Sequence, residues 1–211
     1  MTITAEVESW PEHVVFNNVS WELYERLLRE TREQNLRFTY DDGVLEIMSP
    51  LAEHEKYKGL IKRMIDAISE ELSIPISSYG STTFKRKSLK KGFEPDECFY
   101  IQHEHEMRWR RRIDIRRDPP PDLVVEVDVS YRTIDKHVIY AAMRVPEIWS
   151  CDDGKLECLH LRAGKYQRRQ NSLAFPFLQP ADLEKYLEML GEADESTIVR
   201  AWRDRLRRLR K

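Results

Sequence analysis

The sequence predicts an α/β fold with a mixed central β-sheet flanked by α-helices. Three observations predict it. Segments with the helical period of apolar residues alternate with short strand-like segments. Asp-Gly pairs at 42–43 and 153–154, a typical hairpin turn, separate strand-like segments. The segment 123–129 is apolar enough to lie at the centre of a sheet, although it carries carboxylates.

The first half of the chain predicts two helices, a hairpin and two further strands. Ser20 is a suitable N-cap for the first helix, and Ser49 followed by Pro50 is a suitable start for the second. The predicted elements are a helix at 20–33, strands at 37–40 and 44–48, a helix from 49 to about 72, and strands at 81–86 and 96–101.

The second half continues the alternation and ends in helices. Residues 103–118 form a charged excursion between two sheet strands, and residues 168–179 are expected to be a surface loop. The predicted elements are a strand at 123–129, a helix opening near Thr133, strands at 147–151, 156–161 and 165–169, and helices at 182–190 and 195–209.

The length of 211 residues suits one domain. We expect an N-terminal arm at 1–19, a core domain at 20–170, and a C-terminal helical extension at 171–211 packed on the same domain. Hydrophobic residues make up 41% of the chain, which is enough for a core.

The sequence predicts a soluble, cytoplasmic protein. No apolar run approaches the roughly 20 residues that span a bilayer, and the first residues do not resemble a secretory signal. Cys98, Cys151 and Cys158 lie in apolar runs at no metal-binding spacing, so we expect buried free thiols.

The net charge of −2 hides two basic segments. The first contains Arg108, Arg110, Arg111 and Arg112, and the second is the arginine-rich end from residue 200 to residue 211. They are either solvated surface or contacts for the phosphate backbone of DNA.

Asp96 and Glu126 are the strongest candidates for a reaction centre. Each lies on an apolar strand, where a carboxylate is costly unless it is paired or binds a metal. Asp122 is four residues from Glu126, roughly 13 Å along the strand, so these two cannot easily share an ion. Asp96 and Glu126 can share one if their strands are neighbours.

A lysine and a histidine complete the candidate set. Lys136 lies in the first turn of the helix after the Glu126 strand, on the same helix face as Tyr140, and can reach back toward the carboxylates. His54 falls within the apolar stripe of the second helix. It is either a satisfied core residue, or a further ligand or general base.

Five ordered segments carry a family resemblance: residues 45–50 with His54, residues 94–101, residues 119–128 followed by Asp135-Lys136, residues 140–142 and residues 145–149. Together they resemble the PD-(D/E)XK nuclease superfamily and, more closely, the family of restriction-endonuclease domains of bacterial genomes.

The resemblance implies a restriction-endonuclease-like core and hydrolysis of phosphodiester bonds assisted by Mg²⁺ (or Mn²⁺). Asp96 matches the motif aspartate and Glu126 the acid of the E-X-K motif. Asp128 stands where the superfamily has its lysine, and Lys136 on the following helix matches the displaced lysine.

Three functions remain open from the sequence. The first is a metal-dependent DNA endonuclease in which Asp96 and Glu126 hold the metal and Lys136 and His54 assist. The second is a catalytically inactive nuclease-fold module that binds nucleic acid or a protein partner. The third is a structural or dimerising protein, and a homodimer is left open.

Overall fold

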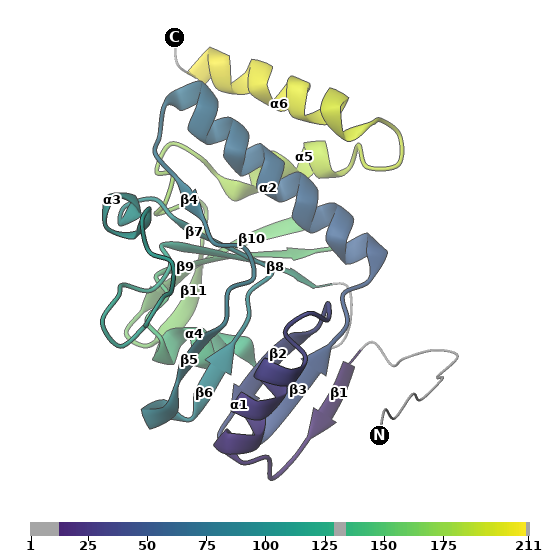
Figure 1. Ribbon diagram of the computed structural model, residues 1–211. Coiled ribbons are helices and arrows are strands. Elements are labelled where there is room, and N and C mark those ends of the chain that lie inside the picture. The colour runs from purple at the N-terminus through teal and green to yellow at the C-terminus, as the bar shows by residue number, and fades with distance from the viewer. Residues whose placement is uncertain (1–12, 129–133, 210–211) are drawn as a thin grey trace.

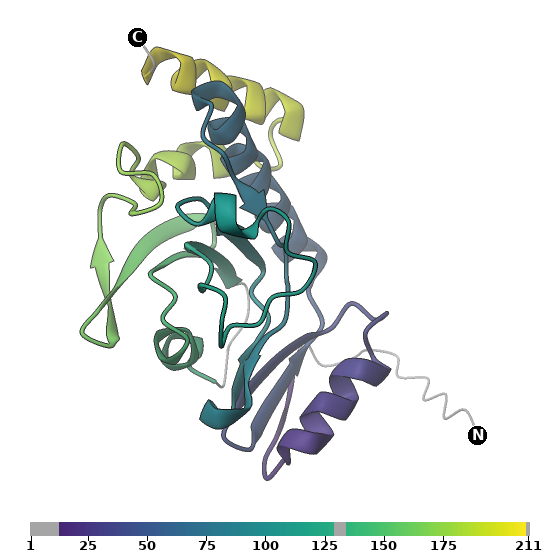
Figure 2. The ribbon, with the colours of Figure 1, turned by 60° about the vertical axis from the view of Figure 1, so that its left-hand side comes forward.

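The computed structural model describes residues 13–128 and 134–209 and confirms the predicted α/β architecture. The mixed sheet is present, flanked by helices (Figure 1). Beside it lies a second, smaller sheet, which the sequence pattern did not separate from the first. Figure 2 shows the smaller sheet and its helix as a lobe below the larger sheet.

The larger sheet has six strands within the described residues, in the order β11-β10-β9-β8-β7-β4. Strands β8 and β9 pair in parallel, and the other pairs are antiparallel. Strand β8 lies inside this sheet, between β9 and β7, and this position explains its apolar sequence. The strands are β4 (Ser77–Ser78), β7 (Glu97–Tyr100), β8 (Leu123–Asp128), β9 (Glu147–Asp152), β10 (Lys155–Arg162) and β11 (Lys165–Arg169).

Helices cover both faces of this sheet, and strand alternation sorts the side chains of β8 between them. Val125 and Val127 pack into the cluster beneath α2 (Ala52–Leu72). Val124 packs on the other side with the side chains of α4 (Lys136–Ala142). Glu126 therefore shares the α4 side of the strand.

The smaller sheet is antiparallel, in the order β1-β3-β2-β6-β5. Helix α1 covers one face of it, and Trp21 and Tyr24 of this helix pack against Tyr40. The strands are β1 (His13–Phe16), β2 (Arg37–Asp41), β3 (Val44–Met48), β5 (Phe84–Arg86) and β6 (Lys91–Phe93).

The C-terminal helix lies along α2. The Trp202 indole N–H donates to the Met64 carbonyl at 2.9 Å, and Glu71 accepts from Arg203 and Arg207. None of the helices within the described ranges is long and apolar enough to cross a membrane. The remaining helices are α1 (Trp21–Glu30), α3 (Glu104–Met107), α5 (Glu184–Leu187) and α6 (Glu195–Leu209), with 3₁₀ turns at Lys87–Leu89 and Pro180–Leu183.

Of the three helix starts predicted at Ser20, Ser49 and Thr133, only the first is confirmed by the structure. Ser20 caps α1 as predicted. Ser49 does not cap α2: the helix begins at Ala52, and extended Leu51 is the N-cap residue without a side-chain hydrogen bond. Glu53 and Glu55 in the first turn stabilise the helix start through the dipole instead. Thr133 lies outside the described residues, and α4 begins at Lys136 with Asp135 as its cap.

Three further segments depart from the prediction. The predicted strand at 81–86 is reduced to Phe84–Arg86, and the helix at 182–190 is a 3₁₀ turn followed by a single helical turn. The prediction of a surface loop at 168–179 is wrong in part, because Phe175 and Leu178 are fully buried in the core beneath α2.

The three cysteines are buried free thiols, as predicted. Burial raises the pKa of Cys151 to about 12 and raises the pKa of Cys98 and Cys158 as well. Burial thus favours the protonated thiol, which is a poorer nucleophile than the thiolate.

Candidate active site

Asp96 and Glu126 are brought together at one end of the β7–β8 pair. Glu97 pairs with Val125, so the two strands are neighbours, as the sequence predicted. Asp96 directly precedes β7, and its Oδ2 accepts from the Val127 N–H at 2.7 Å. Since that N–H belongs to the peptide following Glu126, the Asp96 carboxylate lies beside the Glu126 backbone. Asp96 and Glu126 are only 1% and 3% exposed.

Helix α4 supplies both side chains that hold the Glu126 carboxylate. Lys136 Nζ donates to Glu126 Oε2 at 2.8 Å, and the Tyr140 hydroxyl donates to Oε1. The two donors are one helical turn apart. Asp135 fixes the start of α4, because its side chain accepts from the His137 N–H at 2.9 Å. The expected contact between Lys136 and a site carboxylate is therefore present.

His54 joins the site from the first turn of α2. Its Nε2 lies 3.0 Å from Asp96 Oδ2, and its Nδ1 lies 3.5 Å from Glu55 Oε1. The side chain is buried. His54 is thus in contact with the candidate carboxylate Asp96, and it is not held by apolar neighbours alone.

Two further buried acids border the site, and the sequence reasoning missed both. Glu46 on β3 accepts from the Ile134 N–H at 3.0 Å, so it connects the smaller sheet to the segment before α4. Glu94 accepts from Phe38 N–H and the Thr83 hydroxyl. Burial raises the pKa of Glu94, and the nearby Lys136 is among the groups that lower it. Glu46 lies in an apolar predicted strand, where a carboxylate is costly to bury, and this signal could have identified it as a candidate.

Glu97 is a third missed acid, on the α2 side of β7. Its Oε2 is buried without a hydrogen-bond partner within the described ranges. Burial raises the pKa of Glu97 to about 7, against the lowering effect of Lys62 and Lys58 on α2. A buried carboxylate with an unsatisfied oxygen is costly unless a cation or a proton compensates it.

The residues present fit a hard divalent cation. Asp96 and Glu126 offer carboxylate oxygens, which Mg²⁺ and Mn²⁺ prefer, and His54 offers an imidazole nitrogen that suits Mn²⁺ better. The donor set is rich in oxygen and poor in sulfur, so it does not suit a zinc site of the thiolate type.

A comparison with protein-family models identifies the family of this chain. The Uma2 family model, described as "Putative restriction endonuclease", matches residues 21–191. The chain belongs to that family. The resemblance noted from the sequence is thereby confirmed, and family membership places the chain among nucleases of the restriction-endonuclease type.

One solved structure is also similar to the chain, a "putative nuclease belonging to DUF820" from Anabaena variabilis. It has a TM-score of 0.49 and 11% sequence identity, and the match covers 70% of this chain and 88% of that chain. No curated protein matches the chain significantly.

A second cluster of potential metal ligands in this nuclease-family chain is better explained as a loop anchor. Atoms of Glu147, Cys158 and His160 lie within 4.8 Å of one another. Four donors already occupy the Glu147 carboxylate, which leaves no lone pair directed at an ion. The donors are Trp149 Nε1 at 2.8 Å, Cys158 Sγ at 3.2 Å, Leu173 N at 2.9 Å and Ala174 N at 2.7 Å.

The predicted nucleic-acid-binding arginines are not next to the carboxylates. They follow α3, beyond the C-terminal end of β7, whereas Asp96 precedes its N-terminal end. Figure 1 shows α3 on the opposite side of the molecule from the start of α2. Arg108 is ion-paired with Glu104, and Arg110 lies 3.4 Å from Asp118. Arg111 and Arg112 are exposed.

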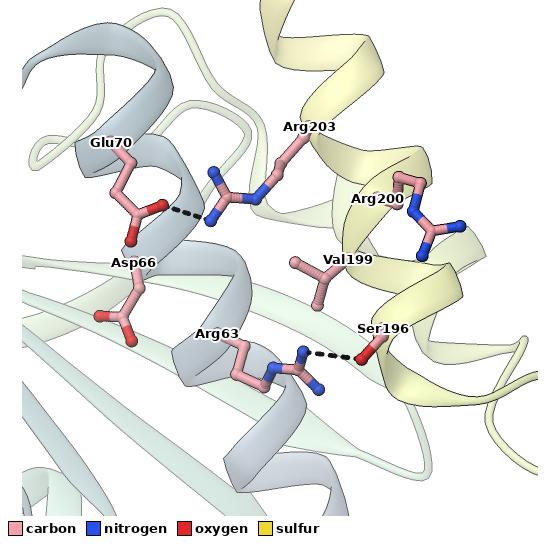
Figure 3. A pocket seen from close by; sticks show the side chains of 7 residues that line it. All are labelled: Arg63, Asp66, Glu70, Ser196, Val199, Arg200 and Arg203. Carbon is pink, nitrogen blue, oxygen red and sulfur yellow. Dashed lines mark hydrogen bonds and ion pairs between the residues drawn. The ribbon is translucent and has the colours of Figure 1, made fainter.

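The C-terminal arginines mainly attach α6 to the rest of the chain. Arg203 contacts Glu70 and Glu71, and Arg205 lies 3.0 Å from Asp182. A cavity of about 330 Å³ lies between α2 and α6, with Arg203 reaching Glu70 and Arg63 reaching Ser196 across it (Figure 3). This cavity is an ion-paired helix interface far from Asp96. Arg210 and Lys211 lie outside the described residues.

Proposed function

We propose that this protein is a metal-dependent endonuclease that hydrolyses phosphodiester bonds of DNA. The observation that carries the proposal is the contact of the Asp96 carboxylate with the peptide N–H following Glu126, while Glu126 is paired with Lys136. Two buried acids with a cation beside them provide what phosphodiester hydrolysis requires: metal ligands and a positive charge for the phosphoryl group.

Asp96 and Glu126 would hold the metal, Mg²⁺ or Mn²⁺. When bound, the ion supplies electrophilic stabilisation of the charge that develops on the phosphoryl oxygens. The peptide N–H of Val127 and the His54 imidazole keep Asp96 oriented, and α4 keeps Glu126 oriented. Preorganised ligands of this kind need no rearrangement when substrate arrives.

Lys136 stabilises negative charge on the scissile phosphate or orients the attacking water. Its side chain is 7% exposed and its ammonium donates to Glu126, so the substrate phosphate can share the ammonium with Glu126. A helix start disfavours a cation by a few tenths of a kcal/mol, and the Glu126 carboxylate offsets this.

His54 accepts a proton or serves as a further ligand. The contact of Nε2 with Asp96 Oδ2 orients the ring, and Nδ1 faces Glu55. We further propose that the loop arginines contact phosphates. Arg111 and Arg112 are the stronger candidates, because Arg108 and Arg110 are already ion-paired.

Plasmid cleavage tests the proposal directly. Wild-type protein is expected to nick or linearise supercoiled DNA with Mg²⁺ or Mn²⁺ and to lose this activity in EDTA. Asp96→Asn should reduce the rate by at least about 100-fold, since it removes a charged ligand of the metal. The readout is the conversion of supercoiled to open-circular plasmid on a gel.

Asp122→Asn is the matched control. Asp122 is also a buried acid that accepts backbone N–H groups, from Ile101 at 2.8 Å and from His103 at 2.9 Å, but at the other end of β8. Its substitution should leave the specific rate of the folded protein close to that of wild type. Equal activity of Asp96→Asn and wild type would disprove the metal site. Inactivity of pure wild-type protein with every divalent cation would favour the non-catalytic module that binds nucleic acid.

A further inference from the structure

Trp109 is the most solvent-exposed of the large hydrophobic side chains that the structure describes. It is 83% exposed, whereas Trp21, Trp149 and Trp202 are each 7% exposed or less. It lies in the sequence Arg-Trp-Arg-Arg-Arg, directly after α3. An indole of this size normally packs against the protein unless its surface serves another contact.

The exposure of Trp109 is not caused by a poorly held segment. The Tyr79 hydroxyl lies at the carbonyl of Met107 and 3.1 Å from the carbonyl of Arg110, so it holds the chain on both sides of the tryptophan. Met107 is fully buried. Farther along, the Asp114 N–H donates to the Asp118 carboxylate at 2.8 Å. The fold thus presents the indole outward from a fixed backbone.

The charges around Trp109 favour one kind of partner. Arg110 and Arg116 are neutralised by Asp118 and Asp114. Arg111 and Arg112 are exposed, and neither has an ion-pair partner in the described part of the chain. Two unneutralised guanidinium groups beside an exposed indole match phosphates spaced along a strand with a base between them.

We propose that Trp109, Arg111 and Arg112 form a docking platform for single-stranded DNA. A base stacks on the indole, and the neighbouring phosphates pair with the two arginines. A single strand fits better than a duplex, because both faces of a paired base are already stacked. This platform is separate from the carboxylate site, at the other end of β7, and binding to it requires no metal.

Binding in EDTA tests the platform without any contribution from cleavage. The probe is a twelve-residue oligothymidylate with a fluorescein label, followed by fluorescence anisotropy. Trp109→Ala should weaken binding by about 5- to 150-fold, which corresponds to one stacked base. Trp109→Phe should retain most of the affinity, because an aromatic face remains.

The tryptophan itself gives a second readout. In a Trp10→Phe background, which removes the tryptophan outside the described residues, unlabelled oligothymidylate should quench indole emission. Trp109→Ala should abolish that quenching. The same oligonucleotide annealed to its complement should bind at least about tenfold more weakly, since stacking is worth about this much.

Salt dependence tests the arginines. The double variant Arg111→Gln/Arg112→Gln should lower the slope of log K against log salt by about 1.4, or about 0.7 for each lost phosphate contact. The matched control is Arg26→Gln/Arg32→Gln, which removes the same charge from exposed positions near α1 and should leave the slope unchanged.

Urea midpoints equal to that of wild type would show that each variant is folded, as exposed positions predict. The platform is disproved if Trp109→Ala binds the single strand as tightly as wild type, if Trp109→Ala weakens duplex binding as much as single-strand binding, or if wild type binds no oligonucleotide. A negative result here leaves the plasmid assay untouched. Failure of cleavage likewise leaves binding in EDTA interpretable.

Discussion

Glu126 is a buried carboxylate that depends on its neighbours for its charge. Lys136 donates to one of its oxygens and Tyr140 to the other. All three side chains are buried. A buried ion pair contributes little net stability, but removal of one partner leaves an uncompensated charge in the interior. The stability of the fold and the proposed chemistry therefore depend on the same pair.

This pair can be tested by substituting one or both partners. Lys136→Met should lower the free energy of unfolding by about 3–5 kcal/mol, because Glu126 is left without its cation. The double variant Lys136→Met/Glu126→Gln should recover most of that loss, since no charge remains. Urea denaturation at pH 7.5 in EDTA measures both values.

Neither variant should cleave DNA, because the cation is missing from both. Lys155→Met, at an exposed lysine paired with Glu188, is the control and should be close to wild type. Equal free energies of unfolding for the single and the double variant would show that the charges of Lys136 and Glu126 are not coupled. Because Lys136 is buried against Glu126, its loss is expected to affect the stability of the fold as well as the cleavage of DNA.

At the scale of elements, the loop after β11 depends on a carboxylate of β9. Glu147 accepts from the N–H groups of Leu173 and Ala174, which places Phe175 in the core. His160 lies beside this anchor, with its Nε2 3.4 Å from Cys158 Sγ. Burial lowers the pKa of His160, although Glu147 opposes this.

The lowered pKa predicts a stability that decreases in mild acid. The unfolded chain, with a histidine pKa near 6.5, binds more protons than the folded chain in this range. The contribution of neutral His160 is therefore fully present above about pH 6.5 and is lost as the pH falls below it. His160→Gln should show a smaller drop in urea midpoint between pH 7.5 and pH 5.5 than wild type. Parallel midpoints at the two pH values would contradict the prediction.

Local sequence signals predicted the long elements and missed the short ones. Helix α6 and strand β8 have clear periodicity over many residues, and the structure has them where the pattern indicated. Strand β4 has two residues, too few for a period, and β6 depends on pairing with distant β2. Phe175 was predicted to lie in a surface loop, because no local pattern shows that Glu147 binds the N–H groups just before it.

At the scale of the molecule, the two sheets meet around the proposed reaction centre. Glu46 of the smaller sheet accepts from the Ile134 N–H, directly before α4 of the larger sheet. The smaller lobe therefore helps to fix the start of the helix that carries Lys136. Figure 2 shows this lobe extending from the larger sheet with only one side of it covered by α1.

Substitution of Glu46 should affect both stability and cleavage. Glu46→Ala leaves the buried Ile134 N–H unpaired and should cost about 1–3 kcal/mol in the free energy of unfolding. Glu46→Gln keeps an oxygen acceptor and should cost less. Urea denaturation and plasmid nicking measure the two effects, with half-buried Glu157→Ala as the control. Wild-type behaviour of Glu46→Ala would show that the lobes position α4 without this bond.

The sequence could predict only those site residues that the cost of burying a charge identifies. That cost identified Asp96 and Glu126, because acids on apolar strands need partners. It applies equally to Asp122, which the fold satisfies with backbone N–H groups of a turn. Only the three-dimensional pairing separates an acid that stabilises a turn from one that joins a reaction centre. Glu46 carries the same desolvation signal in the sequence, but only the three-dimensional pairing places Glu46 and Glu97 relative to the site.

Helix α6 runs in the same direction as α2: its start contacts Arg63, and its later turns contact Glu71, near the α2 C-terminus. Helix α2 is 21 residues long, or roughly 31 Å, and His54 is in its first turn. The end of α6 therefore points away from the carboxylates. A programmable DNA-targeting module fused after α6 would leave the reaction centre uncovered. The linker would have to be longer than α2 to bring the DNA bound by that module to the carboxylates.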